Sequence, residues 1–169
     1  MSKNIDAADL KMLFEFPRII HQLHRAFDGV ATDAFAEFLD DEPDSLFDPL
    51  SDEFNFGALY ATETGLFYEL GYRQSGNTIL CGVTLSLEVD SDDIDVFETS
   101  MAKAAQEWPG WKREQANVDG EDFIFWHHTR PADEFVAKDK PVEAMQKFFL
   151  ACVEELKAIK KKYPSMPWA

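Results

Sequence analysis

Two strand–turn–strand patterns restrict what this chain can fold into. In the first, Gly65–Arg73 and Thr78–Val89 are rich in alternating apolar residues and are separated by a turn that contains glycine. In the second, Trp111–Gln115 and Glu121–Thr129 flank the turn residues Asp119–Gly120. Strands joined by such short turns pair antiparallel. The sequence therefore predicts an antiparallel sheet of about four to five strands.

Helical patterns surround and separate these hairpins. Apolar residues recur at helical spacing in Asp6–Asp28, in Thr32–Leu39, in Ser91–Trp108 and from Pro141 to Tyr163. The fold class predicted is therefore α+β, with N-terminal, middle and C-terminal helices packed against the sheet. A chain of 169 residues is of ordinary size for one domain, so we expect a single domain over 1–169. A short C-terminal tail is expected over 164–169, after Pro164 ends the last helix.

Negative charge is concentrated in the first part of the chain. Between Ala26 and Ala102 there is one basic residue, Arg73, against 18 acidic ones, so this segment carries −17 of a chain whose net charge is −16. Such a segment repels polyanions and attracts a basic surface. We therefore expect no direct nucleic-acid binding.

The densest acidic stretch is expected to be an irregular acidic loop over 40–56, because prolines and isolated apolar residues interrupt it. This loop is the leading candidate for binding a partner. Its candidate contact residues are Asp40, Asp41, Glu42, Asp44, Asp48, Asp52 and Glu53. An acidic surface that only keeps the protein soluble is the alternative interpretation.

Cellular location and cysteine chemistry follow from composition. Residues Met1–Asp9 lack the apolar stretch of a secretory signal, and no apolar run approaches the length of a membrane span. We therefore expect a cytoplasmic protein without a membrane segment. Cys81 and Cys152 lie in apolar surroundings, which favours buried free thiols.

Residues that could carry chemistry do not form a recognisable catalytic set. Trp108, Trp111, Trp126 and His127 are close enough in sequence to line a pocket, although aromatic side chains more often belong to the core. His21 and His24 are three apart on a predicted helix, a spacing that two metal ligands can use, but no third ligand is indicated. We therefore expect no metal, no cofactor and no catalytic residues.

Three functions remain open. The leading hypothesis is a non-catalytic acidic binding protein, of the immunity, inhibitor or adaptor type, that engages a basic protein surface. The order of elements and the low isoelectric point resemble the small acidic chaperones of type III secretion, and this resemblance implies an α+β homodimer. The third alternative is a metal-dependent hydrolase or degenerate nuclease-like domain that uses Glu69, Glu88 or His127.

Overall fold

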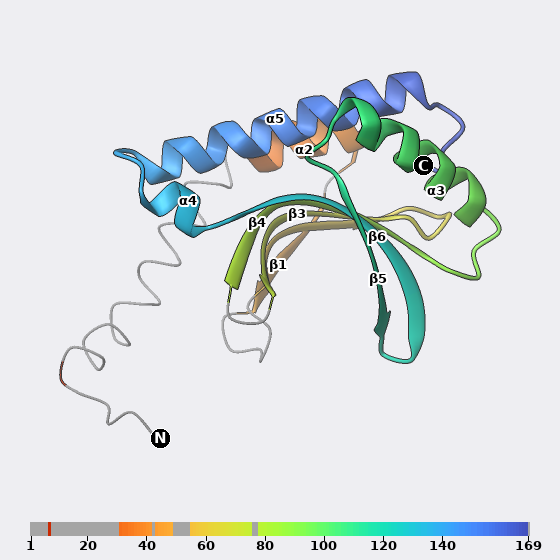
Figure 1. The fold of residues 1–169 in the computed structure, drawn as a ribbon, viewed down its shortest axis with the longest axis horizontal. Helices are drawn as coiled ribbons and strands as arrows, with labels where there is room; N and C mark the ends of the chain where they lie inside the picture. Colours follow the sequence, from red (N-terminus) through yellow and green to blue (C-terminus); the bar gives the residue numbers. More distant parts are fainter. Residues whose placement is uncertain (1–6, 8–30, 42, 49–54, 76–77, 169) are drawn as a thin grey trace.

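Six strands pair antiparallel in one sheet, and four helices accompany it in the part of the chain that the structure describes (Figure 1). The structure is a computed structural model, and it describes residues 7, 31–41, 43–48, 55–75 and 78–168. The elements in chain order are α2 (Ala31–Leu39), β1 (Asp44–Asp48), β2 (Asn55–Ala61), β3 (Phe67–Ser75), β4 (Thr78–Glu88), α3 (Ile94–Glu107), β5 (Lys112–Val118), β6 (Glu121–Pro131), α4 (Asp133–Val136) and α5 (Pro141–Lys162).

The strand order is β1-β2-β3-β4-β6-β5. Strands β1 to β4 follow each other as neighbours, and α3 then leads to the hairpin β5–β6. Strand β6 pairs with β4, which leaves β5 at the edge of the sheet. The α+β class, the antiparallel sheet and the middle and C-terminal helices predicted from the sequence are confirmed. The predicted helix over 6–28, with His21 and His24, lies outside the described residues apart from Ala7.

The helices lie on one side of the sheet (Figure 1). Side chains alternate along a strand, so Cys81, Val83, Leu85 and Leu87 of β4 all point to the helical side, where each is buried. Helix α5 contributes the largest stripe of buried side chains to this core: Met145, Phe148, Phe149, Cys152, Val153, Leu156 and Ile159. Burial of each large apolar side chain contributes about 1.5–3 kcal/mol, so this layer holds the helices to the sheet.

The prediction of an irregular loop over 40–56 is wrong for part of that segment. Residues Asp44–Asp48 form strand β1, which pairs antiparallel with β2, and β2 already begins at Asn55. This segment gives no strand signal because it is short and carries an aspartate at each end. Both properties suit an edge strand, one side of which has no neighbouring strand to bond. The sheet therefore has six strands instead of the four to five expected.

A row of glycines crosses three neighbouring strands. Gly57 of β2 lies opposite Gly71 of β3, and Gly71 lies opposite Gly82 of β4. A Cβ atom on Gly57 would lie 2.1 Å from the carbonyl oxygen of Leu70. Glycines at such positions allow a sheet to bend sharply. The bending of the sheet away from α5 is visible in Figure 1.

The two cysteines are buried free thiols, as the sequence predicts. Cys81 lies in β4 and Cys152 in α5, and both are fully shielded from solvent. Burial raises the pKa of each thiol to about 12. The thiolate, which is the reactive form, is therefore scarce at neutral pH.

We expect neither thiol to react with a thiol-specific disulfide reagent while the protein is folded. At about pH 8 the native protein should react far more slowly than the protein unfolded in urea, in which both thiols are exposed. The measurement is the absorbance of the released aromatic thiol over time. Fast reaction of one thiol in the absence of urea would show that its region opens readily or that the thiol is not buried.

Candidate functional site

The sheet face opposite α5 is the candidate functional site, and we call it the outer face. None of the described helices covers it (Figure 1). Its members follow from strand register and from the alternation of side chains. Those whose side chains the structure describes include Asp44, Leu59, Phe67, Glu69, Thr84, Ser86, Glu88, Lys112, Glu114, Phe123, Phe125, His127 and Thr129.

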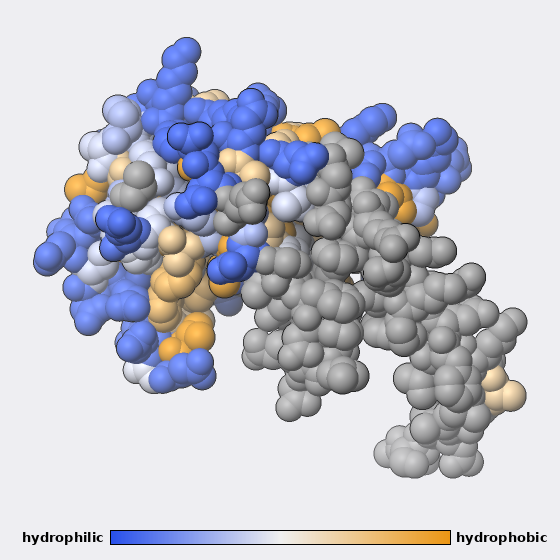
Figure 2. All heavy atoms as spheres, turned by 180° about the vertical axis from the view of Figure 1, so that it is seen from behind, coloured by the Kyte–Doolittle hydropathy of each residue, from blue (hydrophilic) through white to orange (hydrophobic). Residues whose placement is uncertain are grey.

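Three phenylalanines gather on the outer face near the end of β4. The ring centroids of Phe67 and Phe123 are 6.1 Å apart, and those of Phe123 and Phe125 are 6.0 Å apart. Phe67 is on β3 and the other two are on β6, with β4 between these strands. The rings meet across β4 because its outer-face residue at this point is the small Ser86, which lies opposite both Phe67 and Phe125. Figure 2 shows apolar surface near the β5–β6 hairpin with hydrophilic surface around it.

Larger side chains on both neighbouring strands flank the polar residues of β4, since Thr84 lies between Glu69 and His127 and Ser86 lies between Phe67 and Phe125. Thr84 and Ser86 expose only 4% and 6% of their surface. The sequence indicates that this face of β4 is the wetter one, because three of its five residues are polar. The structure shows that large residues on the neighbouring strands shield these positions, which the sequence of β4 alone does not reveal.

Carboxylates lie next to the phenylalanines on the outer face. Glu69 of β3 lies opposite Thr84, and Thr84 lies opposite His127 of β6. His127 is within 3.7 Å of a carboxylate oxygen of Glu114, and its Nδ1 is 3.1 Å from the hydroxyl oxygen of Thr129. Asp44 belongs to the same row through Leu59 and is exposed.

A second acidic cluster lies where β4 ends. Asp90 and Glu121 lie close enough to Glu88 for their charges to act on its carboxyl group. The pKa of the Glu88 carboxyl is raised, first by its burial and then by the negative charges of Glu121 and Asp90. None of the ion pairs among the described residues involves these three acids. This end of the outer face is therefore strongly negative.

The acids predicted from the sequence to bind a partner do not all lie together. Asp40 and Asp41 follow the end of α2, where the hydroxyl of Tyr60 donates a hydrogen bond to Asp41. Asp44 and Asp48 bound strand β1, and only Asp44 has a side chain that the structure describes. The positions of Glu42, Asp52 and Glu53 lie outside the described residues.

The predicted pocket of three tryptophans and His127 is not brought together. Trp111 and Trp126 are buried in the core on the helical side of the sheet, and Trp108 is partly buried at the end of α3. His127 follows Trp126 directly on β6, so its side chain lies on the outer face instead. The alternation of strand side chains, which is already present in the sequence, separates these two residues.

Sequence reasoning missed a polar cluster between the sheet and α5. The Nδ1 atom of His128 is 2.9 Å from a carboxylate oxygen of Glu155, and the indole N–H of Trp111 donates to the same oxygen at 3.1 Å. Gly110 leaves room for the His128 ring, since a Cβ atom there would lie 2.2 Å from its Nε2. Glu155 thus connects α5 to His128 of β6 and to Trp111, the residue just before β5. Only long-range contacts create this cluster, so no local sequence signal points to it.

Comparison of this chain with protein-family models, with curated proteins and with solved structures finds no match. Among the described residues, no three metal-ligating side chains are grouped so that they could hold an ion. None of the described helices has the length and apolar character needed to cross a membrane. The chemistry of the outer face therefore has to be judged from its own residues.

Proposed function

We propose that this protein is a non-catalytic binding protein that holds a basic, partly apolar segment of another protein against the outer face of its sheet. The observation that carries the proposal is the group of Phe67, Phe123 and Phe125 on that face, with the carboxylates of Glu88 and Glu114 directly opposite two of its members. Protein interfaces commonly combine an apolar centre rich in aromatic residues with a polar rim. The outer face has this composition.

The negative charge of this protein indicates that the expected partner is basic. The chain carries a net charge of −16, and the acids of the outer face include Asp44, Glu69, Glu88 and Glu114. A field of this sign accelerates association with a basic surface and loses strength as salt is added. The three phenylalanines supply contact area that does not depend on salt. We therefore expect affinity to fall with salt without disappearing.

A secretion-chaperone-like homodimer is the second candidate. It is favoured by the element order, since a helix precedes the first strands, another separates the two groups of strands, and a long helix follows them. This candidate predicts a dimer, so a monomer measured by light scattering would count against it. The hydrolase alternative has less support, because Glu69 and His127 lie on strands that β4 separates and Glu88 belongs to another cross-strand row.

The test of the proposed function begins with affinity capture at low salt from cells that express the protein. The captured partner is then purified and its binding is measured by surface plasmon resonance. We expect Phe123→Ser to weaken binding at least about tenfold, because truncation of a central aromatic contact typically has an effect of this size. The double variant Glu69→Gln, Glu114→Gln should slow association and reduce the salt dependence, with little change in the dissociation rate.

The matched control is Asp92→Asn, Asp95→Asn, which removes the same charge from the region where α3 begins. It should slow association less than the outer-face pair does, because its acids are not on the outer face. The proposal would be overturned if no basic protein were retained, or if Phe123→Ser and the outer-face double variant both bound like the control.

A further inference from the structure

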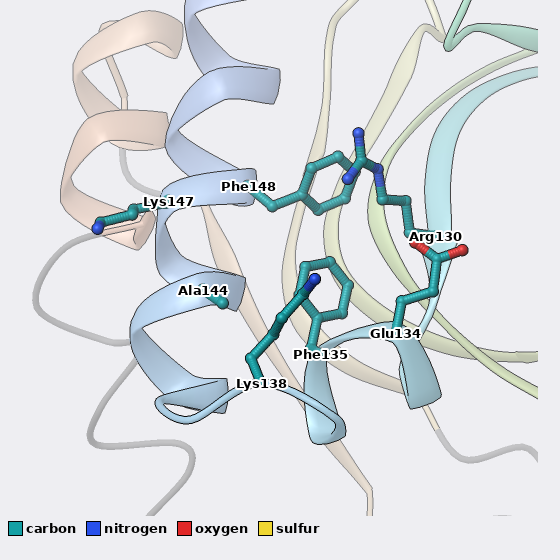
Figure 3. Close-up of a pocket in the computed structure, with 7 residues that line it drawn as sticks. All are labelled: Arg130, Glu134, Phe135, Lys138, Ala144, Lys147 and Phe148. Carbon is teal, nitrogen blue, oxygen red and sulfur yellow. The ribbon is translucent and has the colours of Figure 1, made fainter.

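A cavity of about 340 Å³ lies at the other end of β6, apart from the phenylalanines of the outer face. It is open to solvent on one side and is bordered by the end of β6, by α4 and the residues after it, and by the first turns of α5 (Figure 3). Its lining residues are Arg130, Glu134, Phe135, Lys138, Ala144, Lys147 and Phe148. A volume of this size is at the lower end of the range for small-molecule sites.

The lining is cationic although the chain as a whole is strongly acidic. Arg130, Lys138 and Lys147 face a single acid, Glu134, whereas the net charge of the chain is −16. None of these three cations belongs to an ion pair among the described residues. Figure 3 shows the guanidinium of Arg130 beside Phe148 and the Lys138 side chain in front of Phe135, whereas Lys147 points away. Two positive groups thus remain next to the aromatic rings.

The apolar wall is rigidly supported. The rings of Phe135 and Phe148 have centroids 5.5 Å apart, and each side chain is more than nine-tenths buried. His128 packs edge-on against Phe148 with a centroid distance of 5.2 Å, and Glu155 holds His128 in place. A wall fixed in this way needs little reorganisation when a flat ligand packs against it.

The position of Arg130 allows its guanidinium group to bind an anion. Its guanidinium carbon lies 4.9 Å from the centroid of the Phe148 ring. Stacking on an aromatic face orients the planar guanidinium and leaves N–H groups at its edge available. Such a fork matches the two oxygens of a carboxylate. Lys138, which also lines the cavity, adds a second, more flexible positive charge.

We propose that this cavity binds a small aromatic monoanion. The apolar body of the ligand packs against Ala144 and the exposed edges of Phe135 and Phe148, and its carboxylate is held by Arg130 and Lys138. The carboxylate of Glu134 also lines the cavity, so it disfavours a second negative charge on the ligand. A ligand of one or two rings suits the volume. This inference is independent of the proposed function, because it concerns different residues.

The test is isothermal titration calorimetry with three probes: naphthoate, the neutral naphthylmethanol and inorganic phosphate. Naphthoate should bind saturably, and both other probes should bind at least about tenfold more weakly, because each lacks one of the two recognised features. Arg130→Gln and Lys138→Gln should each weaken naphthoate binding. Lys103→Gln, an exposed lysine in α3, is the matched control and should leave the dissociation constant unchanged.

Two further variants make the outcome decisive. Glu134→Gln should tighten naphthoate binding, whereas weaker binding would overturn a plain anion site. Phe123→Ser, on the outer face, should bind naphthoate like the wild type, so failure of this proposal and failure of the proposed function are distinguishable. The inference would be overturned if naphthoate did not bind, or if Arg130→Gln, verified as folded by circular dichroism, bound it as well as Lys103→Gln does.

Discussion

Gly82→Ala should destabilise the fold by about 3 kcal/mol or more, by adding the strain of an unfavourable backbone conformation to that of overpacking. Gly82 is in β4, at the centre of the sheet, and its φ angle is +154°. A Cβ atom there would lie 2.0 Å from the carbonyl oxygen of His128 and 2.8 Å from the Cα atom of Thr129. Both obstacles are backbone of β6, which cannot move without breaking the pairing of β4 with β6.

Urea denaturation followed by circular dichroism measures this effect. The matched control is Gly65→Ala, at a turn residue with a φ angle of +81°, where a Cβ atom would meet no other atom within 4 Å. The free energy of unfolding of this control should fall by only about 1–2 kcal/mol, because the left-handed backbone is strained by a side chain but no clash is added. Equal losses for the two variants would show that β4 and β6 do not approach each other as closely as described.

Trp168→Ala should lower the free energy of unfolding by about 3–5 kcal/mol, the range for truncation of a large buried aromatic side chain. Trp168 exposes only 7% of its surface. The centroid of its ring lies 6.2 Å from the ring centroid of Phe38 and 6.4 Å from the ring centroid of Tyr68. Its indole N–H donates to the carbonyl oxygen of Tyr163 at 2.8 Å, and its own carbonyl oxygen accepts a hydrogen bond from the Tyr68 hydroxyl at 3.1 Å.

Trp168→Phe separates the two contributions of this residue. It keeps most of the aromatic contact and loses the indole N–H, so it should cost much less, about 1–2 kcal/mol. The free energy of unfolding in urea is again the measurement. A loss below about 1 kcal/mol for Trp168→Ala would contradict the packing of this residue against α2 and β3.

The sequence predicts only a short tail over 164–169, but most of this segment packs against the core. Met166, Pro167 and Trp168 are buried, and the hydroxyl of Thr64 donates to the carbonyl oxygen of Pro167 at 3.2 Å. Pro164 correctly indicates the end of the helix, since the helix ends at Lys162. A single tryptophan in a short segment gives no periodic signal, so nothing local shows that it returns to the core.

Only part of the candidate site could be predicted from the sequence. The sequence favours the core as the place of the aromatic side chains around Trp126. That interpretation is correct for Trp126, whereas Phe123 and Phe125 lie on the outer face. Their contact with Phe67 depends on the pairing of β4 with both β3 and β6. The pairing of β4 with β6 spans the whole of α3 and β5, so no pattern within one strand reveals it.

The sequence by itself determined the hairpins β3–β4 and β5–β6, the helices α3 and α5, and the burial of both cysteines. These features depend on local physics: the period of apolar residues, turn residues, and proline at helix ends. Only the tertiary structure decided that β1 joins the sheet, that glycines align in register, that Trp168 returns to the core, and that Arg130 meets Phe148 beside a cavity. Each of these depends on contacts between residues distant in the chain, whose free energy appears only when the surfaces meet.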